Sequence, residues 1–157
     1  MANFADVIRT PEPIREVSDL NIILNHVTML MRGICESSNI SLTLRLGDEP
    51  FLVNMDPQQF EQVLVNIIKN SVEAVGENGW IEVETRKQER KALFVRDNGK
   101  GISKDGQEQL FTPFYSTKKD GQGIGLTLTK EILRNHGFCF SLETVREGVT
   151  EFTIIFD

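Results

Sequence analysis

The sequence predicts one domain of the α+β class, and two kinds of residue pattern support this prediction. Apolar residues recur at i, i+3 and i+4 in residues 18–36 and 56–75, which is the spacing of an amphipathic helix. Apolar and polar residues alternate in residues 40–46, and the expected strands 80–86 and 91–97 follow each other closely, as in a hairpin. A chain of 157 residues is long enough to bury one core.

The first 17 residues are predicted to be a lead-in, and the domain is predicted to occupy residues 18–157. Thr10-Pro11-Glu12-Pro13 interrupts any helix that begins before it, because each proline lacks a backbone donor and restricts the residue that precedes it. Two interpretations remain open for the lead-in. It is either a linker in a piece of a longer protein or a flexible tail.

The first helix and the first two strands are expected between residues 18 and 53. Ser18 is a suitable N-cap for the helix over 18–36. Residues 40–46 are expected to form a strand with one buried face, and residues 51–53 a shorter second strand. The apolar face of the helix is predicted to comprise Leu20, Ile23, Leu24, Val27, Leu30, Met31 and Ile34.

The helix that begins at Asp56 and Pro57 carries the first candidate binding residues. Its two sides differ in character. The apolar side comprises Phe60, Val63, Leu64, Ile67, Ile68, Ser71, Ala74 and Val75, and the polar side comprises Gln62, Asn66, Lys69, Asn70 and Glu73. A polar side is ordinarily just solvated. Asn66 and Asn70, however, are one turn apart and can direct two amide oxygens to one point, and such oxygens suit Mg²⁺.

The stretch Asp97-Asn98-Gly99-Lys100-Gly101-Ile102 follows a predicted buried strand. Glycine allows the main chain to approach a ligand closely or to adopt a positive φ. A carboxylate beside such a loop can accept a hydrogen bond from an exocyclic amine. An acid followed by glycines is also ordinary turn chemistry, so this motif alone favours a simple turn.

The region after residue 101 is predicted to contain a loop, a glycine-rich helix start and two strands. Residues 102–120 fit a lid anchored by Phe111 and Phe114, or a surface loop that these rings attach to the core. Gly121, Gly123 and Gly125 open a helix to about Asn135, and a helix N-terminus with free amides suits phosphate. The spacing matches neither a dinucleotide fingerprint nor a P-loop. Strands are expected at 138–144 and 151–156, joined by a turn at Gly148.

Composition excludes several classes of function. The net charge of −6 and the lack of a long basic run argue against nucleic acid as a partner. No apolar run approaches the ~20 residues needed to span a bilayer, and no signal-peptide pattern is present. Cys35 and Cys139 lack metal-ligand spacing, so a zinc site is not expected with only His26 and His136. Two free thiols fit a reducing cytoplasm, and one disulfide stays possible.

Taken together, four motifs resemble the ATP-binding catalytic domain of bacterial sensor histidine kinases, within the superfamily of DNA gyrase, Hsp90 and MutL. The resemblance runs from about Asp56 to the end, with the motifs in the family's order. Residues 66–71 resemble the N box and 97–101 the first glycine box. Residues 111–114 resemble the F box and 121–126 the second glycine box, with Gly148-Val149-Thr150 as the final G-x-T. The sequence of residues 112–118 is most similar to that of the nitrogen-regulator branch of these kinases.

The resemblance implies a fold, a ligand and residue roles. The fold is a two-layer α/β sandwich of the Bergerat type, in which a mixed, mostly antiparallel sheet packs on helices. The ligand is Mg·ATP, with Asp97 on the adenine amino group, Asn70 on Mg²⁺, and Asn66, Lys69 and Lys118 along the phosphates as the catalytic set. Further ATP contacts implied by the motifs are Gly99, Gly101, Ile102, Gly121, Gly123, Ile124, Gly125, Leu126 and Thr150.

Three departures from the family pattern refine this expectation. ATP-hydrolysing members of the superfamily place a Glu where this chain has Asn66, and an amide cannot act as a general base. Neither His26 nor His136 is followed by the acid that marks a phosphoacceptor, so both are expected to be structural or surface residues. Many members have a basic residue where this chain has Glu73, so the phosphates would depend more on Lys69 and Lys118.

The sequence is thus interpreted as the catalytic domain of a sensor histidine kinase that donates the γ-phosphate to a histidine on a separate dimerisation domain of its parent. A response regulator is an indirect partner, and nucleic acid and direct membrane contact are not expected. The fragment is expected to be monomeric and cytoplasmic, with a parent that can be anchored in the inner membrane. A hydrolysing ATPase, an anti-sigma-like serine kinase and a non-catalytic nucleotide-binding module remain as alternatives.

Overall fold

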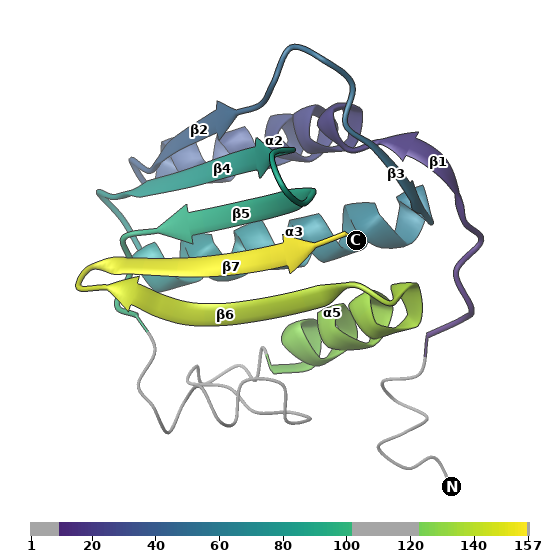
Figure 1. Cartoon of the computed structure of the whole chain (residues 1–157). Coiled ribbons are helices and arrows are strands. Elements are labelled where there is room, and N and C mark those ends of the chain that lie inside the picture. The colour runs from purple at the N-terminus through teal and green to yellow at the C-terminus, as the bar shows by residue number, and fades with distance from the viewer. Residues whose placement is uncertain (1–9, 102–122, 157) are drawn as a thin grey trace, which may run out of the picture.

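The fold is built around a five-stranded sheet with the strand order β2-β4-β5-β7-β6 (Figure 1). The computed structural model describes residues 10–101 and 123–156, and of residues 123–125 it describes the backbone alone. The strands are β2 (Ser41–Arg45), β4 (Trp80–Arg86), β5 (Ala92–Asp97), β6 (Cys139–Arg146) and β7 (Val149–Ile155). β2 and β4 are parallel, and the other neighbouring pairs are antiparallel. The predicted mixed, mostly antiparallel sheet is therefore confirmed.

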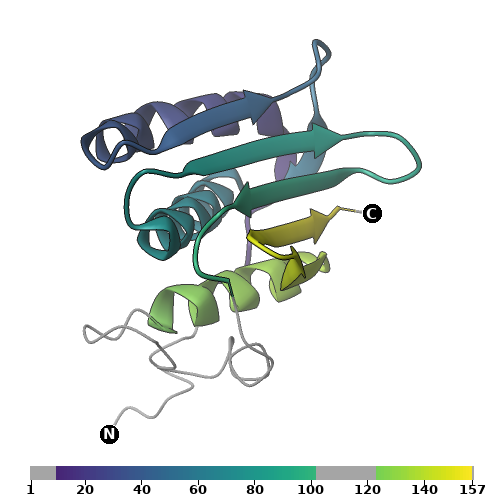
Figure 2. The same ribbon diagram turned by 90° about the vertical axis from the view of Figure 1, so that its left-hand side faces the viewer.

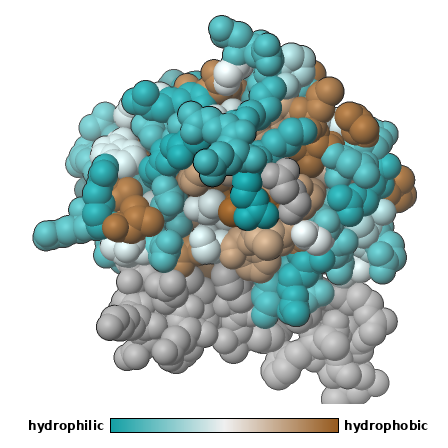
Figure 3. Space-filling model, viewed as in Figure 1, coloured by the Kyte–Doolittle hydropathy of each residue, from teal (hydrophilic) through white to brown (hydrophobic). Residues whose placement is uncertain are grey.

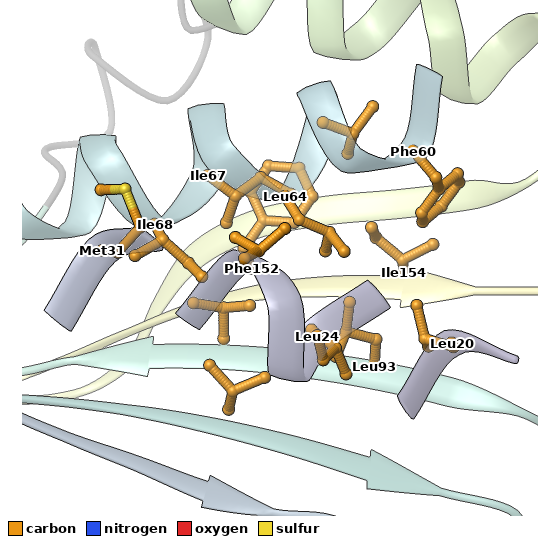
Figure 4. Packing of buried hydrophobic residues seen from close by; sticks show 14 of the residues in the cluster. Leu20, Leu24, Met31, Phe60, Leu64, Ile67, Ile68, Leu93, Phe152 and Ile154 are labelled. Atoms are coloured by element: carbon orange, nitrogen blue, oxygen red, sulfur yellow. The ribbon is translucent and has the colours of Figure 1, made fainter. Parts of the chain in front are cut away.

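In the described part of the chain, three helices cover one face of this sheet and together form the second layer (Figure 2). They are α2 (Leu20–Ser37), α3 (Pro57–Val75) and α5 (Gly123–His136). Figure 4 shows that α2 and α3 direct apolar side chains onto β5 and β7, where Leu93, Phe152 and Ile154 meet them. The two-layer architecture agrees with the prediction.

Helix α3 is central to the core and begins where the sequence indicates. Asp56 is its N-cap, and its carboxylate accepts hydrogen bonds from the backbone N–H groups of Gln58 and Gln59. Pro57 occupies the first turn, where a missing donor costs nothing. The predicted apolar side is confirmed for the residues that are buried, which are Phe60, Val63, Leu64, Ile67, Ile68 and Ser71.

The start of the domain differs from the prediction. Ser18 lies in a strand, β1 (Glu16–Asp19), which pairs antiparallel with β3 (Leu52–Met55), and the cap of α2 is Asp19. Asp19 serves better than Ser18 because its Oδ1 accepts both from the Asn21 N–H and, across the chain, from the Phe51 N–H. Part of the predicted lead-in is thus folded against the domain.

The buried side of α2 is also narrower than predicted. Leu30 and Ile34 are about half exposed, at 55% and 49%, whereas Thr28 and Cys35 are buried. The buried residues follow the line Leu24, Val27, Met31 and Cys35 toward α3 and the sheet, and Leu30 and Ile34 lie beyond its edge. Periodicity placed the helix correctly but made its apolar side too wide.

The face of the sheet opposite the helices is mostly hydrophilic where Figure 3 colours it. At its centre Arg96 bonds to carboxylates on both neighbouring strands, namely Glu82 and Glu84 of β4 and Glu151 of β7. Among residues 10–101 and 123–156, no helix is long and apolar enough to cross a membrane.

Candidate functional site

The candidate site begins at Asp97, which ends the central strand β5 and is only 4% exposed. Its Oδ1 accepts the Gly99 N–H at 2.8 Å. Burial raises the pKa of this carboxyl above its ordinary value, and hydrogen bonds from the Gly99 N–H and the Ser71 hydroxyl oppose that rise only in part. A carboxylate has about four acceptor positions, so Asp97 retains capacity for a further donor.

The loop after Asp97 is pressed against the C-terminal end of α3. A Cβ on Gly99 would lie 2.7 Å from the backbone carbon and oxygen of Ala74, so no other residue fits there without displacement. The Lys100 N–H donates to the Ala74 oxygen at 3.3 Å, and Asn98 Oδ1 accepts the Trp80 N–H at 2.8 Å. The glycine at 99 therefore has a packing role that fixes Asp97 next to α3.

Thr150 lies directly across from Asp97 on β7. Side chains at directly opposed positions share a face of the sheet, with their Cβ atoms roughly 5 Å apart. Thr150 is 6% exposed, and its Oγ1 has no hydrogen-bond partner among the described residues. Asn21 Oδ1 and Gln59 Oε1 share this property elsewhere, and Gln59 lies beside the buried carboxyl of Asp56. A buried hydroxyl without a partner suits a ligand that offers a polar atom.

Gly101 closes the loop against the same corner. It has a φ of +78°, and a Cβ here would lie 3.1 Å from Thr144 Oγ1 and 3.8 Å from Thr150 Oγ1. The missing side chain therefore keeps the space beside the two threonine hydroxyls open. Asp97, Gly99, Gly101 and Thr150 are thus brought together as the motifs predict.

The α3 residues of the predicted N box lie along one stretch of the same helix. Asn66 and Asn70 are both partly buried, and Lys69 is exposed. Ser71, one residue after Asn70, hydrogen-bonds to Asp97, so this end of α3 adjoins the carboxyl. The sequence pattern places Ser71 on the apolar side of the helix and at the end of the N box, and predicts no role for its hydroxyl. A hydroxyl on an apolar side, immediately after a candidate ligand, was the available signal for its role.

The third part of the site is α5, which begins at Gly123 and packs along α3. Leu126 is partly buried against the core. The side chain of Ile124 and the surroundings of Gly123 and Gly125 lie outside what the structure describes. The same holds for Ile102, Lys118, Gly121 and the F box over residues 111–114, so the predictions for these positions stay predictions.

A metal ion in this site would depend on amide oxygens. Among residues 10–101 and 123–156, no group of three or more His, Cys, Asp or Glu side chains is arranged to hold a metal. Asn66 and Asn70 offer neutral oxygens, which fit Mg²⁺ when phosphate and water supply its other ligands.

The two histidines lie away from this site. His136 is buried and ends α5. His26 on α2 is exposed, and its Nε2 lies 3.4 Å from Glu61 Oε1. The expectation that both are structural or surface residues agrees with these positions.

The chain is similar in sequence to known signalling kinases. Residues 55–157 match the family model described as histidine kinase-, DNA gyrase B-, and HSP90-like ATPase. Over 138 residues, or 87% of this chain, it is 33% identical to the sensor histidine kinase ZraS of Salmonella typhimurium. It is 37% identical over 119 residues, or 74% of this chain, to sporulation kinase C of Bacillus subtilis. The matched parts are 30% and 28% of those proteins, so the chain spans less than a third of their length.

Solved structures agree with this result. The catalytic domain of the histidine kinase ThkA superposes with a TM-score of 0.82 at 28% identity, covering 90% of this chain and 94% of that one. ThkA in complex with the response regulator protein TrrA gives a TM-score of 0.75 at 28% identity, covering 91% of this chain and 42% of that one. The fold derived above is therefore that of histidine kinase catalytic domains.

Proposed function

Because the chain belongs to the histidine kinase-, DNA gyrase B- and HSP90-like ATPase family, we propose that residues 18–157 bind Mg·ATP and donate its γ-phosphate to a histidine on a separate domain of the parent protein. The observation that carries this proposal is the buried pair of Asp97 and Thr150. Asp97 can accept a hydrogen bond from the adenine amino group. Thr150 Oγ1, which has no partner among the described residues, can form a hydrogen bond at the same end of the base.

The phosphates would extend from this corner along α3 toward α5. In this arrangement Asn70 is the ligand for Mg²⁺, and Asn66 and Lys69 lie beside the phosphates. Bound Mg²⁺ would neutralise charge that develops on the transferred phosphoryl group. Lys118 and the glycines at 121, 123 and 125 complete the proposed set, with Ile102, Ile124 and Leu126 at its margins. These residues bind and orient the nucleotide, which is most of the catalysis that phosphoryl transfer requires.

Transfer is favoured over hydrolysis by one residue on α3. Asn66 occupies the position, one turn before Asn70, at which a general base would activate water. An amide cannot accept that proton at neutral pH. The acceptor would instead be an imidazole nitrogen, which forms a bond to the γ-phosphorus as the bond to the bridging oxygen breaks and ADP leaves.

We also propose the domain organisation of the parent protein and its partners. The first 17 residues would connect this domain to a dimerisation domain that carries the acceptor histidine. A response regulator would then receive the phosphoryl group. The complex of the histidine kinase ThkA with the response regulator protein TrrA supports this step. The parent is proposed to keep this domain in the cytoplasm, with an anchor in the membrane. The sequence of residues 112–118 favours assignment to the nitrogen-regulator branch of these kinases.

A calorimetric titration of Mg·ATP into the wild type and Asp97→Asn tests the proposal, with GTP as the control ligand. We expect saturable ATP binding in the wild type, a large loss in the variant and no binding of GTP. Equal affinity of both proteins for ATP would contradict the assignment of Asp97. Phosphate release without an acceptor domain would favour a hydrolysing ATPase over a histidine kinase.

A further inference from the structure

Residues 10–15, here named the strap, run across the ends of two helices before the domain's first strand. The strap contacts the N-terminal end of α3 and the C-terminal end of α5, which lie together at one side of the molecule (Figure 1). These are the two helices that carry the proposed phosphate and Mg²⁺ residues farther along their length. No motif of the family covers this segment in the present sequence.

The strap bonds to α3 through the residues that form its first turn. The Ile14 N–H donates to Asp56 Oδ2 at 2.9 Å, while Oδ1 of the same carboxylate caps the helix. Gln59 Nε2 donates to the Pro11 oxygen at 3.0 Å. The N-cap of α3 is therefore shared between the helix and the strap.

The strap bonds to α5 through Arg15 and Thr10. Arg15 Nη1 donates to the His136 oxygen at 3.1 Å, while Nε and Nη2 donate to the Asn54 oxygen at 3.2 and 2.8 Å. The guanidinium also lies 5.6 Å from the centre of the Phe138 ring. Asn135 Nδ2 donates to Thr10 Oγ1 at 2.9 Å. One side chain, Arg15, thus joins the end of α5 to the strand that leads into α3.

His136 completes the connection inside the protein. Its Nε2 accepts the Asp56 N–H at 3.0 Å, so the ring proton is on Nδ1, which donates to the Ile132 oxygen at 2.8 Å. The ring stacks on Phe138 and meets Phe60 edge-on. The start of α3 and the end of α5 are consequently joined directly by His136 and a second time by the strap.

The strap is held mainly by polar contacts at the surface, whereas the helices are held by the core. Arg15 is exposed, and the Ile14 side chain is 82% exposed. A segment with little apolar burial opens at a small free-energy cost, while a packed helix moves as a unit. Asn70 is 14 residues along α3 from Asp56, or roughly 21 Å at 1.5 Å per residue, and a stiff helix can transmit a shift over that length.

We propose that Arg15 is a positioning residue through which the strap sets the relative placement of α3 and α5, and thereby the affinity for the phosphates of the nucleotide. This inference rests on the proposed function. It predicts a selective effect, because the base would be held by Asp97 and Thr150 on β5 and β7, which the strap does not touch. Release of the strap is expected to weaken phosphate binding and to leave binding of the base unchanged.

The test compares Arg15→Ala with Arg45→Gln, a control in which an exposed arginine on the sheet face opposite the helices loses its ion pair with Glu82. Mg·ATP affinity is measured by calorimetry, and adenosine affinity by displacement of a fluorescent ATP analogue. We expect Arg15→Ala to bind Mg·ATP about threefold to tenfold more weakly, with adenosine affinity unchanged. Arg45→Gln should match the wild type for both ligands.

Three outcomes would overturn the proposal. These are unchanged Mg·ATP affinity in Arg15→Ala, an equal loss of Mg·ATP and adenosine affinity, and the same selective loss in Arg45→Gln. If the wild type binds neither ligand, the proposed function fails, and hydrogen exchange of the apo protein decides the role of the strap. Exchange in residues 66–75 must then be faster in Arg15→Ala than in the wild type and unchanged in Arg45→Gln. Equal exchange rates in all three proteins would refute the proposed role of the strap in placing α3 and α5.

Discussion

A buried aspartate lies beside each end of α3, Asp56 as its N-cap and Asp97 of β5 next to its C-terminal end, and the surroundings of the two carboxyls shift their pKa values in opposite directions. Burial would raise the pKa of Asp56, but hydrogen bonds from the backbone N–H groups of Ile14, Gln59 and Gln58 outweigh it and hold the pKa below its ordinary value. Burial raises the pKa of Asp97, and two hydrogen bonds do not offset it. The first carboxylate stabilises the fold, whereas the second is held at a cost in stability.

This contrast extends to the neighbouring polar groups. Both ring nitrogens of His136 have partners beside Asp56, whereas Thr150 Oγ1 beside Asp97 has none among the described residues. Gln59 Oε1 is an exception at the N-terminal end, although its amide nitrogen is bonded. Buried polar groups that satisfy one another serve the fold, and the unsatisfied hydroxyl beside Asp97 is available to a ligand.

The largest expected effect separates binding from stability at Asp97. Asp97→Asn should lower Mg·ATP affinity about 100-fold, because the amide can no longer offer a charged acceptor to the adenine amino group. The apo protein should be as stable as the wild type or more stable, because a neutral side chain avoids the desolvation of a carboxylate. Calorimetry and thermal denaturation measure the two quantities. A clear drop in melting temperature would show that Asp97 is structural.

Removing the imidazole at the other end should have the opposite outcome. His136→Leu leaves the Asp56 N–H unpaired in the core and removes the imidazole bond to the Ile132 oxygen, so we expect a loss of about 2 kcal/mol in the free energy of unfolding. Urea denaturation measures this loss. His26→Leu serves as the control, because that histidine is exposed, and its effect should be within about 0.5 kcal/mol. Equal effects of the two substitutions would remove the structural role of His136.

A smaller effect is expected at Thr150. Thr150→Val keeps the shape of the side chain and removes the hydroxyl, so Mg·ATP affinity should fall about tenfold. Stability of the apo protein should not decrease, because the hydroxyl oxygen has no partner there among the described residues. Thr150→Ser should retain most of the affinity, since it keeps the hydroxyl. Loss of stability without loss of affinity would place Thr150 in the fold and outside the site.

The smallest effect concerns pH. Burial, the main cause, lowers the pKa of His136 from its ordinary value of 6.5, so the unfolded chain binds a proton more readily than the folded one. The contribution of His136 to stability is complete above about pH 6.5 and declines as the pH falls toward the lowered pKa. Unfolding free energy should be up to about 1 kcal/mol lower at pH 5.5 than at pH 7.5. His136→Leu should reduce this difference. An unchanged dependence of the unfolding free energy on pH in that variant would contradict the prediction.

The sequence predicted the elements of the fold well because periodic patterns record burial directly. Helix α3, its cap at Asp56 and the hairpin of β4 and β5 follow from local residues alone. The strand β1 was missed because Glu16-Val17-Ser18-Asp19 has no apolar alternation, and pairing with β3 determines its structure. The excess width of the α2 apolar side at Leu30 and Ile34 has a similar cause, since only tertiary packing decides which apolar residues are covered.

Prediction of the site was more complete for residues in motifs than for their supports. Asp97, Gly99, Gly101 and Thr150 come together as expected, although Thr150 is distant in sequence. The supports were not predicted, because Ser71 and His136 act through partners that only the folded chain brings near. A local pattern cannot show that the imidazole of His136 bonds to the backbone of Asp56, 80 residues away.

The position of β7 in the sheet has a consequence for the order of events during synthesis. This strand is inserted between β5 and β6, so the sheet is incomplete until residues 149–155 have left the ribosome. The same strand brings Thr150 to Asp97, and domains generally fold as units. A nascent chain that has exposed every other motif would still lack the adenine corner. Capture of nascent chains on an immobilised nucleotide would therefore begin only when β7 emerges.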